Sequence, residues 1–227
     1  MTGFNHNHGS WVNMNNKKII LASESPRRKY LLEQAGIDFE VMPSKIDESD
    51  FIHTESGKSA GFKDPADYVK KLSMAKARDI ADKHIKAWVI GADTIVVIDG
   101  KILEKPGSKD HAATMLKSLS NRTHLVYTGF SLCCRNENRM ITRSVKTEVV
   151  FKKLSDDEIE WYVNTDEPFD KAGAYAIQGI GTFLVKSING SYTNVVGLPV
   201  CEVIEILITE GVITRKRQGM RMTYEYN

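Results

Sequence analysis

Apolar residues follow two different patterns along the chain. Some form short consecutive runs, which are typical of buried strands, and others recur every three or four residues, which is typical of amphipathic helices. The strand-like runs cover residues 18–22, 39–43, 87–92, 95–98, 123–134, 141–153 and 183–188. The helical patterns cover residues 26–36, 65–80, 108–119, 155–161 and 199–209. This alternation predicts an α/β or mixed α+β fold, and no internal repeat is visible.

Capping and turn residues stand at the ends of several of these elements. A helix is favoured after an N-cap residue and a first-turn proline, and a hairpin turn at an Asp-Gly or Asn-Gly pair. These signals are Ser25-Pro26, Asp64-Pro65, the capping box from Ser155 to Glu158, Asp99-Gly100 and Asn189-Gly190. Residues 52–63 contain few apolar positions, which predicts a long surface loop.

The periodic patterns fill residues 17–213 and predict one domain. Residues 1–16 are rich in asparagine and show no periodicity, so we expect a disordered leader. Residues 214–227 contain the basic run Arg215-Lys216-Arg217, which is typical of a solvated tail.

The composition excludes several classes of partner. The chain has 227 residues, of which 41% are hydrophobic and 26% charged, as is usual for a soluble globular protein. Its formal charge of +2 provides no basic field for non-specific nucleic-acid binding. There is no apolar run of the ~20 residues that a membrane helix needs, and no signal-peptide pattern at the N-terminus. Three cysteines without metal-ligand spacing favour a reduced chain over a disulfide protein. We therefore expect a cytoplasmic protein with no nucleic-acid or membrane partner.

Arg27 and Arg28 lie in the first turn of a predicted helix, where the helix dipole and unpaired N–H groups disfavour cations. The arrangement becomes favourable if a phosphate binds there, because the dipole, the two guanidinium groups and the hydroxyls of Ser23 and Ser25 would act together. On this hypothesis, neutral substitutions weaken phosphate binding and leave helix stability level or higher. The alternative is a solvated basic turn that pairs with Glu24 or Glu33.

Asp93 interrupts an apolar run and is followed by Thr94. A buried carboxylate needs a cation, a metal ion or a hydrogen-bond network, so Asp93 is a candidate catalytic residue. The alternative is that Asp93 marks a bulge or a strand end that is open to solvent.

Three further charged residues are candidate site residues only in combination with Asp93. Lys76 lies on an apolar helix face and projects either into a cleft or, by snorkelling, into solvent. Glu48 follows a strand, and Lys105 follows a hairpin. Two carboxylates with several cations would suit the metal-assisted hydrolysis of a phosphoanhydride.

Ordered motifs along the chain resemble those of the Maf family of nucleoside triphosphate pyrophosphatases. They are Leu21-Ala22-Ser23-Glu24-Ser25-Pro26-Arg27-Arg28, Gly91-Ala92-Asp93-Thr94, Leu103-Glu104-Lys105-Pro106, Asp170-Lys171-Ala172-Gly173-Ala174-Tyr175, Ile177-Gln178-Gly179 and Val196-Gly197-Leu198-Pro199. Together they cover about residues 17–213, and their order and spacing make the resemblance specific. The sequence departs from the family pattern in a longer loop at residues 51–63, and in Asn121 where a glycine is common.

The resemblance implies an elongated mixed α/β fold, with two lobes around a central cleft, similar to that of the inosine triphosphate pyrophosphatases. It also implies hydrolysis between the α- and β-phosphates, dependent on Mg²⁺ or Mn²⁺ and often carried out by a homodimer. Asp93 matches the family's proposed proton acceptor, while Arg27, Thr94 and Gln178 match positions linked to substrate choice. The other matching cleft positions are Ser23, Arg28, Glu48, Lys76, Lys105 and Asp170.

In the mechanism that we expect, Glu48 and Asp93 hold the metal ion, and Asp93 also orients or deprotonates the attacking water. Lys76, Lys105 and the two arginines would neutralise charge on the leaving pyrophosphate. The chain contains no Walker A motif, which argues against a P-loop enzyme.

Gln178 predicts the preferred base. An amide both donates and accepts hydrogen bonds, so it can pair with the O4 acceptor and N3–H donor of uracil or thymine, whereas an ionised glutamate can only accept. Residues 177–179 and 190–192 resemble the branch that cleaves dTTP and UTP. The alternatives are that Gln178 merely holds its own glycine-rich loop, or that the substrate is 7-methyl-GTP.

Two other functions start from the same residues. A nucleotide-binding regulator of cell division would use the same phosphate pocket but would return its ligand intact. A purely structural protein would leave Arg27, Arg28 and Asp93 unexplained.

Overall fold

A computed structural model of the chain describes residues 11–48, 64–165 and 167–215. Its strands are β1 (Trp11–Asn13), β2 (Ile19–Leu21), β3 (Glu40–Val41), β4 (Trp88–Ile98), β5 (Lys101–Leu103), β6 (Thr123–Cys134), β7 (Arg139–Phe151), β8 (Val185–Asn189) and β9 (Ile213–Arg215). Its α-helices are α1 (Pro26–Gln34), α3 (Pro65–Ala81), α4 (Lys109–Leu119), α5 (Asp156–Val163), α6 (Tyr192–Val196) and α7 (Val200–Thr209). Four 3-10 segments complete it: η1 (Met14–Asn16), η2 (Glu167–Asp170), η3 (Ala172–Ala174) and η4 (Gly179–Leu184). The predicted mixed α/β class is confirmed.

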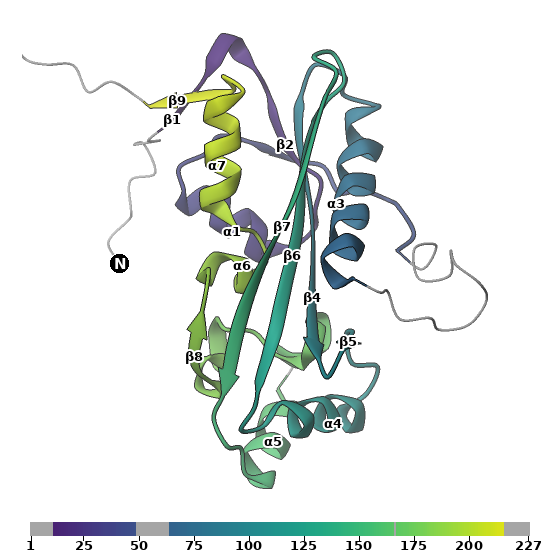
Figure 1. Ribbon diagram of the computed structural model, residues 1–227, viewed down its shortest axis with the longest axis vertical. Helices are drawn as coiled ribbons and strands as arrows, with labels where there is room; N and C mark the ends of the chain where they lie inside the picture. Colours follow the sequence, from purple (N-terminus) through teal and green to yellow (C-terminus); the bar gives the residue numbers. More distant parts are fainter. Residues whose placement is uncertain (1–10, 49–63, 166, 216–227) are drawn as a thin grey trace, which may run out of the picture.

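The long strands β4, β6 and β7 form the axis of an elongated molecule (Figure 1). They belong to a seven-stranded mixed sheet with the order β3-β2-β4-β6-β7-β8, in which β5 also pairs with β4. The β2 strand is parallel to both of its neighbours, and the other pairs are antiparallel. On one edge, β4 pairs with β2 as far as Ile90 and with β5 from Val96 onward. Residues 91–95 lie in the gap between these two partners.

Side chains alternate along β4 between two faces of the sheet, and this alternation creates separate cores. Val89 packs in a cluster with residues of α3, which covers one face. Trp88 and Ile90 pack on the other face, with residues of α1 and α7. Farther along, Val96 packs with residues of α4 and α5 at the opposite end of the molecule. The structure therefore has two lobes that share the long strands, as predicted.

Two glycines bring α3 unusually close to the sheet. A Cβ atom added to Gly91 would lie 2.3 Å from the Ser73 carbonyl oxygen, and one added to Gly129 would lie 2.2 Å from that of Val69. Any larger residue at either position would push the helix away. This close approach sets how far side chains of α3 reach across β4.

The predicted disordered leader is too long. Trp11–Asn13 form a strand antiparallel to Ile213–Arg215, and the Trp11 indole Nε1 donates to the Ala35 carbonyl oxygen at 3.0 Å. Trp11 and Val12 are apolar in a polar segment, and they gain a partner only from the far end of the chain, which periodicity does not reveal. The rest of the leader, the tail after residue 215 and the loop at 52–63 lie outside the described residues.

Most predicted helices and strands are confirmed, but the structure differs from the predictions in some details. The strand predicted at 183–188 begins later, at Val185, because residues 179–184 form 3-10 turns. The short helix α6 was not predicted. Asn121 adopts φ 57°, a left-handed conformation that asparagine tolerates and that explains why glycine suits this position.

Candidate active site

A cleft of about 630 Å³ opens where β4 lacks a partner strand on its edge. It lies between the end of β2, the N-terminus of α1, the segment after β5 and the segment from η2 to η4. The structure places every predicted site residue in the lining of this cleft: Ser23, Ser25, Arg27, Arg28, Glu48, Lys76, Asp93, Thr94, Lys105, Asp170 and Gln178. These residues are up to 155 positions apart in the sequence, from Ser23 to Gln178, so the fold is what brings them together.

Lys76 lies between two carboxylates in the cleft. Its Nζ is 2.7 Å from Asp93 Oδ1 and 2.7 Å from Glu48 Oε1. Asp93 and Lys76 are almost fully buried, with 7% and 9% of their surface exposed, while the Glu48 side chain is 57% exposed. The close approach of α3 at Gly91 allows Lys76 to reach Asp93. Lys76 therefore projects into the cleft and does not snorkel.

Asp93 lies inside the continuous strand β4, opposite Gly129 of β6. The alternative of a bulge or a solvent-exposed strand end is therefore wrong. Asp93 faces α3, whereas the next side chain, Thr94, faces the opposite side of the sheet and contacts Arg28. The open edge of β4 makes both side chains accessible from the same cleft.

Neighbouring cations keep the Glu48 carboxylate ionised. Burial alone raises the pKa of Glu48, but the charges of Lys76, Lys105 and Arg28 outweigh it and hold that pKa below its usual value. Glu48 therefore carries its charge at neutral pH.

Arg28 is fixed by neutral acceptors. Its Nε donates to the Gly197 carbonyl oxygen at 2.9 Å, its Nη1 to Ser23 Oγ at 3.0 Å and its Nη2 to Thr94 Oγ1 at 3.2 Å. Burial lowers the pKa of its guanidinium below the usual value, although the charge of Asp93 raises it. Arg28 thus places a half-buried positive charge beside Asp93 and also links α1 to β4 and to the segment after α6.

Arg27 has different surroundings, which the sequence does not reveal. Its Nη1 lies 3.3 Å from Asp170 Oδ2, and 28% of its side chain is exposed. This long ion pair connects the two sides of the cleft. Neither arginine pairs with Glu24 or Glu33, since Glu33 instead pairs with Lys29. Ser25 caps α1 by accepting a hydrogen bond from the Arg28 backbone N–H, as predicted.

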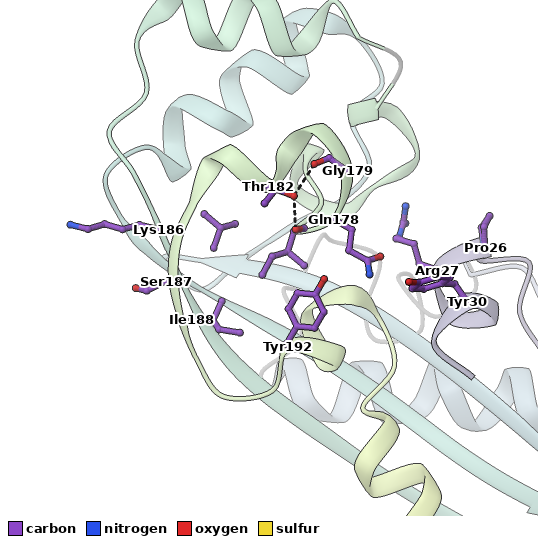
Figure 2. A pocket seen from close by; sticks show the side chains of 12 residues that line it. Pro26, Arg27, Tyr30, Gln178, Gly179, Thr182, Lys186, Ser187, Ile188 and Tyr192 are labelled. Carbon is purple, nitrogen blue, oxygen red and sulfur yellow. Dashed lines mark hydrogen bonds between the residues drawn. The ribbon is translucent and has the colours of Figure 1, made fainter. Parts of the chain in front are cut away.

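A second cavity, of about 840 Å³, adjoins the cleft. The two cavities share Pro26, Arg27, Ile177 and Gln178. In Figure 2 the Gln178 carboxamide points across this cavity toward α1. It makes no hydrogen bond to any of the residues that the structure describes.

Other groups hold the loop that carries Gln178. The Glu167 carboxylate accepts from the backbone N–H groups of Ile180 at 2.8 Å and Gly181 at 3.2 Å. The Thr182 hydroxyl lies 3.0 Å from the Ile177 carbonyl oxygen and 2.8 Å from that of Gly179 (Figure 2). The alternative that Gln178 holds its own loop is therefore unsupported.

Comparisons with known proteins show which family the chain belongs to. The family model of the Maf-like proteins matches residues 18–210. The chain belongs to the Maf family. Two relatives are both named dTTP/UTP pyrophosphatase. The one from Syntrophus aciditrophicus is 50% identical over 87% of this chain and 92% of its own length, and the one from Citrifermentans bemidjiense is 46% identical over 88% and 99%. The structure of the Staphylococcus aureus Ham1 protein aligns with a TM-score of 0.45 at 15% identity, covering 86% of this chain and all of that one.

The carboxylates of this Maf protein fit a divalent metal ion of the kind that prefers oxygen ligands. Glu48 and Asp93 already surround one positive charge, the Lys76 ammonium, at 2.7 Å. In the described part of the chain, no three His, Cys, Asp or Glu residues form a metal-binding group. Two carboxylates suit Mg²⁺ or Mn²⁺, which commonly take their remaining ligands from water and substrate phosphates.

Several residues of the Maf cleft were not identified from the sequence. Tyr68 lines the cleft, and burial raises its pKa to about 12. Lys171, whose side chain is 11% exposed, pairs with Asp170. Tyr30 and Tyr192 line the adjoining cavity. These side chains stand in ordinary helical or polar contexts, so only the fold reveals where they lie.

Proposed function

We propose that this chain hydrolyses dTTP and UTP to the corresponding nucleoside monophosphate and pyrophosphate. The observation that carries the proposal is the buried Lys76 between Asp93 and Glu48, in a cleft that also contains Arg27 and Arg28. The names of the two relatives support the same activity.

Asp93 is the group best placed to handle the attacking water. Lys76 binds its Oδ1, and Oδ2 makes no hydrogen bond to any described side chain. Asp93 would orient a water molecule toward the α-phosphorus and accept its proton as the bond to the β-phosphate breaks. Buried Lys76 and half-buried Arg28 place positive charge beside Asp93 before this step.

The cations of the cleft would stabilise the leaving pyrophosphate. Arg27 and Lys105 are the more exposed of these residues, and among the described residues Lys105 forms no ion pair. Both can therefore move onto phosphate oxygens with little desolvation cost. Groups fixed near a developing charge lower the barrier by several kcal/mol in phosphoryl transfer.

The balance of charge supports dependence on a metal ion. Among the described residues, five cations line the cleft: Arg27, Arg28, Lys76, Lys105 and Lys171. Five anions line it as well: Glu24, Glu48, Asp93, Glu104 and Asp170. These charges cancel, so the cleft alone does not neutralise a triphosphate. We propose that Glu48 and Asp93 hold Mg²⁺ or Mn²⁺, which would supply additional positive charge against the phosphate oxygens.

Gln178 supports a preference for pyrimidines. Its amide is free to pair with the O4 acceptor and N3–H donor of thymine or uracil. Its loop is held on both sides by Glu167 and Thr182, so the amide itself is not needed for structure. A site that pairs with a polar edge rejects bases that leave it unpaired.

The experiment is a panel of nucleoside triphosphates with pyrophosphate detection, run with and without Mg²⁺ or Mn²⁺. We expect metal-dependent release from dTTP and UTP, well above that from GTP, 7-methyl-GTP and ATP. A higher kcat/KM for 7-methyl-GTP would overturn the pyrimidine preference. Tight binding with every nucleotide returned intact would instead identify a nucleotide-binding regulator.

We also propose that the protein acts in the cytoplasm as a homodimer. All three cysteines are free, which suits a reducing compartment. No described helix is long and apolar enough to span a membrane. Sedimentation equilibrium tests the dimer, and a monomer at micromolar concentration would refute it.

A further inference from the structure

The cavity beside the cleft has a different chemical character from the cleft. Its apolar lining includes Ile177, Val185 and Ile188, together with two tyrosines. Tyr30 comes from α1, beside Arg27, and Tyr192 comes from the first turn of α6, near Ile188 (Figure 2). They are 48% and 45% exposed, which leaves nearly half of each residue's surface available to a ligand.

The cavity and the cleft are continuous. Arg27 and Gln178 line both, so a ligand with phosphates near Arg27 extends past Gln178 into the second cavity. A nucleoside triphosphate has the matching division, with an anionic chain at one end and a flat aromatic base at the other.

Tyr192 is presented by a firmly held segment. The Ser191 backbone N–H donates to Thr147 Oγ1 at 3.1 Å, and Ser191 Oγ accepts from the Asn194 N–H at 3.2 Å. Thr128 Oγ1 donates to the Asn194 carbonyl oxygen at 2.9 Å and contacts Thr94 of the cleft at 2.9 Å. These bonds fix α6 relative to the phosphate end of the site, so only the two torsions of the Tyr192 side chain remain free.

We propose that this cavity binds the nucleobase and that Tyr192 stacks on the base, opposite Tyr30. The inference rests on the proposed function and adds the base site to it. Stacking on an aromatic ring holds any planar base, because every base has a π face. Tyr192 therefore supplies affinity for the nucleoside, while Gln178, at the junction with the cleft, selects the base by its polar edge.

Equilibrium binding measurements distinguish the affinity contributed by the base from that contributed by the phosphates. We would titrate dTTP and inorganic tripolyphosphate, which has no base, into the Asp93→Asn protein in the presence of Mg²⁺. Adding Tyr192→Ala should weaken dTTP binding by about ten- to a hundredfold, the range given by the loss of one stacked base. It should leave tripolyphosphate binding within about twofold, whereas Lys105→Ala should weaken both ligands.

Two further variants control for the shape of the side chain and for the general loss of an aromatic residue. Tyr192→Phe keeps the ring and should retain most of the dTTP affinity. Trp161 is a 56% exposed aromatic residue that lines neither cavity, so Trp161→Ala should leave both affinities unchanged.

Three results would overturn the base site. They are unchanged dTTP binding in the Tyr192→Ala protein, an equal loss for dTTP and tripolyphosphate, and an equal loss in the Trp161→Ala protein. Each of these would leave pyrophosphate release by the unmodified chain intact, so the proposed function would stand. If the unmodified chain released no pyrophosphate while the binding pattern held, the proposed function would fail and the base site would remain.

Discussion

Individual residues in the cleft depend on each other because its central ion pair, Lys76 with Asp93, is buried. Asp93 has its charge matched by Lys76, and Lys76 in turn contacts Glu48. Removing one member leaves another uncompensated, which costs more than the contact itself contributes. Single substitutions should therefore have effects that do not add.

Asp93→Asn keeps the shape of the side chain and removes its charge. We expect kcat for dTTP to fall by ~10² or more, as is usual when a general base is lost, with a smaller change in KM. Asp99→Asn is the matched control, because Asp99 lies at the end of the same strand and pairs with Arg122 on the surface. Near-normal turnover in the Asp93→Asn protein would remove Asp93 from the mechanism.

The two arginines of α1 should behave differently when each is replaced by alanine. Arg28→Ala removes three hydrogen bonds from a partly buried network, and we expect the free energy of unfolding to fall by roughly 2–4 kcal/mol. Arg27→Ala removes an exposed ion pair, so it should raise KM with little change in stability. The expectation that removing Arg28 leaves stability level or higher is therefore revised. Urea unfolding tests this, and equal losses in both variants would contradict it.

At the scale of elements, the sequence predicts much of the framework. The starts of α1 and α3 follow from Ser25-Pro26 and Asp64-Pro65, since capping depends only on neighbouring residues. The Asp99-Gly100 turn follows in the same way, with φ values of 51° and 73°. In contrast, the pairing of β1 with β9 and the gap beside β4 depend on partners far away in the chain, which no local pattern reveals.

The candidate site likewise contains residues that the sequence identifies and residues that only the fold reveals. Motifs and unfavourable local positions identify Arg28 and Asp93. A charge inside an apolar run, or a cation at the positive end of a helix dipole, needs a partner to explain it. Tyr192 and Glu167 show no such conflict, since a tyrosine and a glutamate in a polar stretch of sequence are ordinary. Their positions follow from the way α6, η2 and η4 fold around the second cavity.

Glu167 should act as a positioning residue for the Gln178 loop. Glu167→Gln replaces one carboxylate acceptor with a weaker one and allows residues 178–181 to shift. We expect the ratio of kcat/KM for dTTP over GTP to fall about five- to tenfold, the effect of ~1 kcal/mol, while release from GTP changes little. Glu160→Gln, on the exposed face of α5, is the control. An unchanged ratio would show that the loop does not need Glu167.

At the scale of the whole molecule, the second lobe contains a buried histidine. His124 donates or accepts a hydrogen bond at 2.7 Å with the Tyr175 hydroxyl and packs edge-on against Phe151. Burial lowers the pKa of His124 to about 4. The folded protein therefore keeps this imidazole neutral under conditions in which the unfolded chain protonates it.

This histidine predicts a loss of stability in mild acid. In the unfolded chain this histidine has an ordinary pKa near 6.5, so it becomes protonated as the pH falls below that value. In the folded chain it stays neutral until the pH falls to about 4. The contribution to stability is complete above the unfolded pKa and falls by about 2 kcal/mol between pH 7 and pH 5. His124→Gln should remove this part of the pH dependence, whatever its effect at pH 7. Urea unfolding at both pH values tests it, and an unchanged slope would rule out His124 as the cause.

The elongated shape and the shared strands place the phosphate cleft between two separately packed lobes. Arg27 and Asp170 meet across this cleft, so binding of a triphosphate competes with a contact that joins the lobes. In the proposed binding mode, the α-phosphate lies near Asp93 and the base lies in the second cavity. The central claim is therefore a particular bond cleavage, between the α- and β-phosphates.

Hydrolysis of dTTP in ¹⁸O-labelled water, followed by mass spectrometry of the products, tests that claim most directly. Attack on the α-phosphorus predicts dTMP that carries one ¹⁸O atom, together with unlabelled pyrophosphate. Formation of dTDP and inorganic phosphate, or recovery of intact dTTP, would contradict it.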